Sequence, residues 1–181
     1  MDYVKSISEA VLMTKKIDIT PVIVGGEQSY LLTDLLKKNN VPVILAQVHS
    51  RPSTDDADID QPFKTPRMLA EAGILFCLKM DDGPEQSRNL PFQAGHAAGF
   101  GLDKEAALSS ITLNAAKILG IDKTVGSLET GKDATLFIST GDALDIRGNK
   151  VEHAFISGKK IDLGNKQKAL YEKYMKKYSR K

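Results

Sequence analysis

Short apolar runs alternate with amphipathic stretches through the first 120 residues of the chain. The apolar runs are rich in Val, Ile and Leu, which is typical of strands buried on both faces of a parallel sheet; they cover residues 21–24, 42–48 and 74–78. Around them hydrophobic positions recur at helical spacing, predicting helices near residues 4–12, 28–38, 64–71, 91–101 and 103–119. This alternation predicts an α/β fold of about three parallel βα units, with the helices outside the sheet.

The pattern changes towards the C-terminus. A single apolar stripe along the last of these helices is formed by Leu108, Ile111, Ala115, Ile118 and Leu119. Gly120 stands where a helix C-cap favours a residue that tolerates left-handed backbone. A polar cluster at 129–133 followed by a β-prone run at 134–138 predicts a strand pair that turns at Gly131. A final helix is expected over residues 166–178.

Two ordered motifs carry a resemblance to a known family. The first is Ile111-Thr-Leu-Asn-Ala-Ala-Lys-Ile-Leu-Gly, and the second is Val125-Gly-Ser-Leu-Glu-Thr-Gly-Lys-Asp-Ala-Thr. In this order they resemble the end of amidohydrolase superfamily enzymes, where the last barrel helix leads into a small β-sandwich. Thr135 departs from the Asp that many relatives carry. The segment Arg88-Asn-Leu-Pro, before a helix rich in Ala and Gly, is similar to the imidazolonepropionase-like group.

The resemblance implies a fold and a division of the chain. The fold is the C-terminal part of a (β/α)8 TIM-like barrel, in which the three strands correspond to the sixth, seventh and eighth. The division is a partial barrel over residues 1–120, a β-sandwich limb over 121–163 and a C-terminal helix over 164–181. The chain is therefore expected to be a piece of a longer enzyme, covering its C-terminal half.

The strongest catalytic candidate is Asp81. In an eight-stranded barrel the catalytic groups lie at the C-terminal ends of strands. Asp81 follows the third apolar run, and the resemblance implies that it binds metal and takes a proton from the attacking water. Lys79 and Met80 stand where the family has small residues, and Asp82 is an alternative by one position. By itself, Asp-Asp-Gly-Pro is typical of a plain turn.

Five further residues are candidates for substrate binding. His49 ends the second apolar run, where a neutral imidazole would bind metal or substrate; the alternative is a loop histidine bonded to the acidic segment that follows. By the resemblance, Gly25 takes the place of a metal-ligand histidine, so this ligand is missing. The pair Gly25 and Gly26 would leave room for substrate. Arg88 and Asn89, in the motif that carries the resemblance, are assigned to substrate binding as well.

Other polar residues are given structural roles. Glu27 is expected to be a carboxylate favoured near a helix N-terminus. The aspartates between residues 55 and 60 lack the order of an EF-hand loop, and a flexible lid over the barrel mouth is expected instead. His96 lies on a small-residue helix face and is expected to be packed or solvent-facing rather than a ligand, and His153 is expected to be structural.

The composition of the chain excludes several classes of protein. A content of 41% hydrophobic and 27% charged residues indicates a folded chain. The net charge of +2 is too small to indicate nucleic-acid binding. Cys77 is alone, which excludes an internal disulfide and a cysteine-based zinc cluster. No apolar run approaches 18 residues, so no transmembrane segment is expected, and the location, cytoplasmic or exported, stays open.

The first hypothesis is a C-terminal fragment of an amidohydrolase-like, metal-dependent hydrolase that cleaves C–N bonds in a small-molecule amide or cyclic amide. The resemblance implies a divalent metal, zinc, in the full-length enzyme. The family's first-strand His-x-His is absent here, so this chain alone is expected to hold no metal and to be inactive. The alternative is a non-catalytic, amidohydrolase-derived binding or scaffolding domain. A stand-alone nucleotide-binding protein is less favoured, because no glycine-rich phosphate loop follows a strand.

Self-association is also expected from the strand count. A barrel needs about eight strands to close, so three parallel strands leave open edges. Such edges pair with other chains unless they are covered, which predicts a homo-oligomer joined through the sheet edges. Alternatively, the final helix folds back over an edge and keeps the chain monomeric, using apolar residues that it carries on one side, Leu170, Tyr171, Tyr174 and Tyr178.

Overall fold

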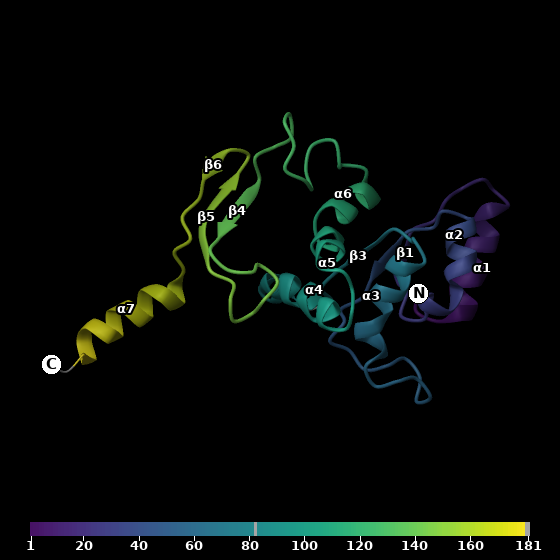
Figure 1. Ribbon diagram of the computed structural model, residues 1–181, viewed down its shortest axis with the longest axis horizontal. Helices are drawn as coiled ribbons and strands as arrows, with labels where there is room; N and C mark the ends of the chain where they lie inside the picture. The colour runs from purple at the N-terminus through teal and green to yellow at the C-terminus, as the bar shows by residue number, and fades with distance from the viewer. Residues whose placement is uncertain (82, 180–181) are drawn as a thin grey trace.

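The computed structural model describes residues 1–81 and 83–179 and contains two small sheets (Figure 1). The first sheet has the parallel order β1 (Ile23–Gly25), β2 (Val43–Leu45), β3 (Phe76–Leu78). Its register aligns Gly25 with Leu45, and Leu45 with Leu78, so that the three strands end level with one another. The α/β class and the three parallel strands agree with the sequence prediction, although each strand is shorter than its apolar run.

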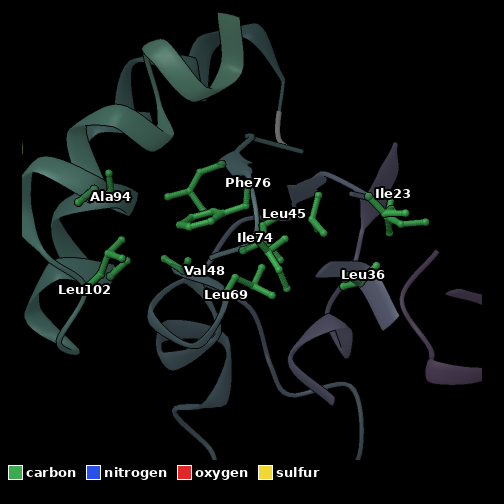
Figure 2. Packing of buried hydrophobic residues seen from close by; sticks show 14 of the residues in the cluster. Ile23, Leu36, Leu45, Val48, Leu69, Ile74, Phe76, Ala94 and Leu102 are labelled. Carbon is green, nitrogen blue, oxygen red and sulfur yellow. The ribbon is translucent and has the colours of Figure 1, made fainter. Parts of the chain in front are cut away.

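One face of the parallel sheet carries the core. The strand residues Ile23, Val43, Leu45, Phe76 and Leu78 are buried there. Helices cover this face, and Figure 2 shows Leu36 and Leu69 pointing into the same cluster as Ala94 and Leu102. These helices are α1 (Val4–Lys15), α2 (Thr33–Lys38), α3 (Gln61–Glu71), α4 (Leu90–Gly99) and α5 (Lys104–Ser110). Because side chains alternate along a strand, Val24 lies on the opposite face, where it is 47% exposed.

Two predicted helices differ from the observed ones. The helix expected over 28–38 begins as a 3-10 turn, η1 (Ser29–Leu32), in which Leu31 is exposed. The helix expected over 103–119 is divided into α5 and α6 (Leu113–Leu119). At the break the Ser110 hydroxyl donates to the Ala107 carbonyl, and Thr112 donates to the Leu108 carbonyl. Hydroxyl side chains that bond back to the helix in this way compete with its regular hydrogen bonds.

The helix caps follow the sequence closely. The Asp103 carboxylate accepts the Ala106 backbone N–H at the start of α5. Gly120 ends α6 with φ +71°, the left-handed conformation that favours glycine at this position. Before α4 the chain passes through a 3-10 segment, η2 (Pro84–Asn89).

The second sheet is antiparallel, with the order β4 (Leu136–Ser139), β5 (Val151–Ile156), β6 (Lys159–Lys160). The predicted strand pair turning at Gly131 is wrong, because the residues before this glycine form turns and only the strand after it exists. Ser157 and Gly158 both have positive φ, which suits the tight hairpin between β5 and β6. A second sheet facing this one is absent from the described residues, so the β-sandwich limb stays a prediction.

A close contact joins the two parts of the chain. Leu144, in the loop between β4 and β5, is buried in the core cluster and lies against α4. A Cβ atom on Gly95 would overlap the Leu144 carbonyl oxygen, so the loop reaches the helix backbone only because this residue is glycine. Lys104 and Asp142 form an ion pair across the same junction, with a nitrogen–oxygen distance of 2.6 Å.

The C-terminal helix α7 (Lys166–Tyr178) has the predicted bounds and stands away from both sheets (Figure 1). Asn165 caps it by accepting the Lys168 backbone N–H. None of its residues is buried, so the alternative in which it folds back over a sheet edge is not what the structure shows. Within residues 1–81 and 83–179, no helix is long and apolar enough to cross a membrane.

Candidate functional site

The carboxyl ends of β1, β2 and β3 meet at one edge of the parallel sheet. Because the strands end level, the segments that follow them leave the sheet side by side. These segments begin at Gly26, Ala46 and Lys79. In a parallel α/β sheet this edge is where ligands and catalytic groups gather.

Glycine is required at the end of β1 by both conformation and space. Gly25 has φ +104° and Gly26 has φ +66°, values that side-chain-bearing residues rarely adopt. A Cβ atom on Gly25 would overlap the Asp2 carboxylate, and one on Gly26 would lie 2.7 Å from a Val43 methyl group. Asp2 and Val43 therefore take the space beside these glycines, where the sequence predicted room for substrate.

The residues at the start of the chain also bond to the edge of β1. The Met1 ammonium donates to the Val24 carbonyl over 2.7 Å, and the Gly26 N–H donates to the Met1 carbonyl over 2.8 Å. The Gln28 N–H donates to the Asp2 carbonyl over 2.9 Å. This edge is thus less open than three strands alone would leave it.

Carboxylates gather at the strand ends. Burial raises the pKa of Glu27 above its ordinary value, and the negative charge of Asp2 raises it further, with a smaller effect from Asp81. Asp81 follows β3 as predicted and forms an ion pair with the Lys79 ammonium. Its alternative, Asp82, lies outside the described residues. The edge is therefore negative, and a lysine of the same segment compensates part of that charge.

The donor set at this edge does not make a metal centre. Across the described ranges 1–81 and 83–179, no three or more His, Cys, Asp or Glu side chains are grouped so that they could hold a metal ion. Gly25 offers no side chain, and the Lys79 ammonium already occupies the Asp81 carboxylate. The carboxylates of Asp2, Glu27 and Asp81 are therefore near one another at this edge, but the described residues do not bring them together as a set of metal ligands.

A small cavity of about 30 Å³ lies between the ends of β1 and β2 and the loop after β2. It has room for about one or two waters. Glu27, Tyr30 and Gln47 contribute to its wall, and the loop residues Ser50 and Ser53 cover it. The Gln28 side chain donates to Ser53 over 3.3 Å and holds the loop in place. The loop after β2 therefore lies beside the strand ends, and its role as a flexible lid stays a prediction.

The acidic part of that loop is bonded to the following helix. Lys64 on α3 lies 3.0 Å from an Asp58 oxygen and 2.8 Å from an Asp60 oxygen. These contacts lower the pKa of Asp60, chiefly through the hydrogen bond from Lys64. Asp58 and Asp60 thus anchor the lid to α3.

His49 points to a different neighbour from the one expected. Its Nε2 lies 2.9 Å from Nδ1 of His96 on α4, and it does not line the cavity at the strand ends. Partial burial lowers the pKa of His49, and a charge on His96 lowers it further. This pair was not predictable from the sequence, because no pattern links residues that are 47 positions apart.

Arg88 and Asn89 lie in the 3-10 segment η2 before α4. Arg88 is exposed, and the Asn89 amide donates to the Gln86 side chain over 2.7 Å within the same segment. The structure gives neither of them a contact with the strand-end residues Gly25 or Glu27. Their role in substrate binding stays a prediction.

Comparison with known proteins gives a consistent result. Residues 12–161 match the sequence profile of the Amidohydrolase family. An imidazolonepropionase of Flavobacterium psychrophilum is 30% identical over 112 residues, which cover 57% of this chain and 27% of that protein. The solved structure of an amidohydrolase from Thermotoga maritima is 28% identical, with a TM-score of 0.79 over 90% of this chain and 42% of that one. An adenosine deaminase from Xanthomonas campestris, solved with bound zinc, shares the fold at a TM-score of 0.50 and 19% identity. The chain thus spans less than half the length of each of these relatives.

Proposed function

This chain belongs to the amidohydrolase family, and from that premise we propose that it is part of a metal-dependent hydrolase that cleaves a C–N bond in an amide or cyclic amide. The observation that carries the proposal is the position of Asp81. It follows β3 at the carboxyl edge of a parallel sheet, and its side chain is 44% exposed to solvent. The relatives named imidazolonepropionase favour an imidazolone propionate as the cyclic amide.

The work of this chain in such a reaction is to move a proton. A carboxylate within reach of the attacking water accepts its proton and passes it to the leaving nitrogen. The Lys79 ammonium forms an ion pair with the Asp81 carboxylate and would hold it beside the end of β3. The lid over the strand ends, tied down through Ser53 and Lys64, would limit the access of bulk water.

The metal belongs to the proposal for the whole protein. A zinc ion supplies a polarised carbonyl and a water of lowered pKa when it is bound. The described residues do not fit a complete metal centre, so no step of this reaction is assigned to a metal held by this chain alone. We expect residues 1–181 on their own to be inactive towards amides.

A second candidate is a non-catalytic binding or scaffolding domain that derives from the same family. It is favoured by Gly25, which offers no ligand at the end of β1, and by the ion pair between Lys79 and Asp81. An ammonium that neutralises the candidate catalytic carboxylate is what a site without metal would need. The two candidates differ in what Asp81 does.

The test compares variants of the longest protein that includes these residues. We expect Asp81→Asn to lower the turnover of an imidazolone propionate by orders of magnitude, with the melting temperature nearly unchanged. Asp122→Asn, in the turn after α6, is the matched control and should leave turnover intact. If Asp82→Asn is the damaging change, the assignment is wrong by one position. If neither variant loses activity, or the unaltered protein shows none, the non-catalytic candidate is favoured.

A further inference from the structure

Two histidines, His49 in the loop after β2 and His96 on α4, form a cluster that the proposed hydrolysis does not use. Nε2 of His49 and Nδ1 of His96 are 2.9 Å apart, and the ring centroids are 4.3 Å apart at an interplanar angle of 61°. Nδ1 of His96 also lies 2.8 Å from the Phe92 carbonyl oxygen. Two imidazole nitrogens and one carbonyl oxygen thus meet at one place on the surface.

Both rings are held by the surrounding structure. The His49 backbone N–H donates to the Gln93 side-chain oxygen over 3.1 Å, and Gln93 is only 4% exposed. Phe63 lies against both rings, with centroid distances of 5.5 Å to His49 and 6.4 Å to His96. Phe63 is itself stacked on Phe100 at 4.8 Å. The rings therefore keep their relative placement with little freedom to be lost on binding a ligand.

The spacing of the two ring nitrogens suits a shared metal ion. Metal–imidazole bonds are about 2.0–2.1 Å long, so two nitrogens bound side by side to one ion lie about 3 Å apart. The observed 2.9 Å meets this condition without movement of the backbone. A mixed set of nitrogen and oxygen donors in a square or tetragonal arrangement is the preference of divalent copper and nickel.

We propose that His49, His96 and the Phe92 carbonyl form a binding site for a divalent copper or nickel ion. His49 contributes Nε2 and His96 contributes Nδ1. A carbonyl oxygen can only accept a hydrogen bond, so the proton of neutral His96 lies on Nδ1 in the metal-free protein. On binding, the metal takes that position and the proton moves to Nε2 of the same exposed ring. The exchange needs no net gain or loss of protons.

The surroundings allow an ion to enter and complete its coordination. His96 and Phe92 border an open hollow of about 380 Å³ between α4 and the loop that carries Leu144. The hollow is large enough for waters to fill the remaining positions on the metal. Its charged residues are Lys104, Asp142 and Asp145, of which the first two neutralise each other. Asp145 leaves the hollow with a net negative character that favours a cation.

Histidine charge state supports the site at neutral pH. Metal ligation requires the neutral imidazole. Partial burial, with a further contribution from His96, lowers the pKa of His49, which favours its neutral form at neutral pH. Protonation of the imidazoles competes with metal binding, so acidification should release the metal.

This site is separate from the strand-end residues and stands whether or not the proposed hydrolysis is correct. His49 does not line the cavity beside Gly25 and Glu27. It is also an open site with three protein donors. We expect reversible binding that dialysis against a chelator removes.

The test is calorimetric titration of the full chain with Ni²⁺ at pH 7.5. We expect one ion per chain, and at least a tenfold loss of association constant in both H49Q and H96Q. The third histidine of the chain, His153, is exposed on β5 and supplies the matched control, because H153Q should bind Ni²⁺ as the unaltered chain does. Asp81→Asn should also leave Ni²⁺ binding unchanged. Circular dichroism confirms that each variant is folded.

A double variant separates one shared ion from two independent sites. If both rings bind the same ion, H49Q/H96Q loses little more affinity than either single variant. With Cu²⁺ in place of Ni²⁺, electron paramagnetic resonance should show coupling to two nitrogens in the unaltered chain and to fewer in H96Q. Additive losses, equal binding by H96Q, or a loss in H153Q of the same size would each overturn the proposal.

Discussion

The contact between Gly95 and Leu144 predicts that a single methyl group will loosen the junction between the two parts of the chain. In Gly95→Ala the new Cβ would overlap the Leu144 carbonyl oxygen and lie 3.0 Å from the carbonyl carbon. These are backbone atoms, so no side-chain rotation relieves the overlap. The loop that carries Leu144 must lift from α4, and Leu144 must leave the core cluster that it now joins.

The expected free-energy change follows from opposing terms. Returning Leu144 to water costs about 1.5–3 kcal/mol. Replacing glycine by alanine inside a helix contributes about 0.5–1 kcal/mol in the opposite direction. The Lys104–Asp142 ion pair is exposed and adds little when it is lost. The net result is a destabilisation of about 0.5–2.5 kcal/mol, which for a chain of this size lowers the melting temperature by roughly 1–10 °C.

A second glycine in the same helix provides the control. A Cβ atom on Gly99, the last residue of α4, would meet nothing within 4 Å. Gly99→Ala should therefore be neutral or slightly stabilising. Both variants are compared by urea unfolding followed by circular dichroism, and by limited proteolysis of the loop over residues 140–150. If Gly95→Ala unfolds with the same midpoint as Gly99→Ala and its loop is cut no faster, the close approach of Leu144 to α4 is not what joins the two parts.

Three further outcomes are expected. The pKa of His49 is lower in the folded chain than in the unfolded chain, so the unfolded chain binds more protons as the pH falls through about 6.5. The stability that His49 contributes above this pH is therefore lost on acidification, and His49→Gln should reduce the loss of thermal stability between pH 7.5 and 5. If the pH dependence of the melting temperature is the same in this variant, the assignment is wrong. Burial raises the pKa of the Cys77 thiol to about 11, so a thiol reagent at pH 8 should modify the native chain far more slowly than the urea-unfolded chain, and equal rates would show that β3 is accessible. The exposed side of the parallel sheet, with Val22 and Val24, predicts self-association, which light scattering at micromolar concentration would detect; a clean monomer mass would contradict it.

Local interactions explain why much of the secondary structure was predictable. Gly120 and Asp103 act as helix caps within one turn of their own chain, and both are where the sequence places them. The apolar runs predicted the three parallel strands for a similar reason, because a strand buried on its helix-covered face needs Ile, Val and Leu whatever its partners are. The predicted strands were longer than the observed ones. An apolar run indicates which residues are buried, but it does not indicate where the hydrogen bonds between strands end.

The division of the helix after Asp103 is a feature that the local sequence pattern did not predict. The stripe of apolar residues continues through the break, so the sequence predicted one helix. The hydroxyls of Ser110 and Thr112 instead bond to carbonyls of α5, and the chain resumes as a separate helix, α6. Serine and threonine make such bonds in some helices and not in others, and the packing of α6 against β3 selects this one.

The candidate site divides in the same way between sequence and structure. The motifs around Gly120 and Gly131 were sufficient to predict the family. The position of Asp81 after an apolar run was sufficient to predict that it follows a strand of the parallel sheet. The partners of these residues came only from the tertiary structure: Asp2 beside Gly25, and His96 beside His49. Such neighbours are separated by tens of residues, and no periodicity or composition connects them. A strand, a cap or a motif is decided by forces between residues close in sequence, whereas a site is decided by which elements the core brings together.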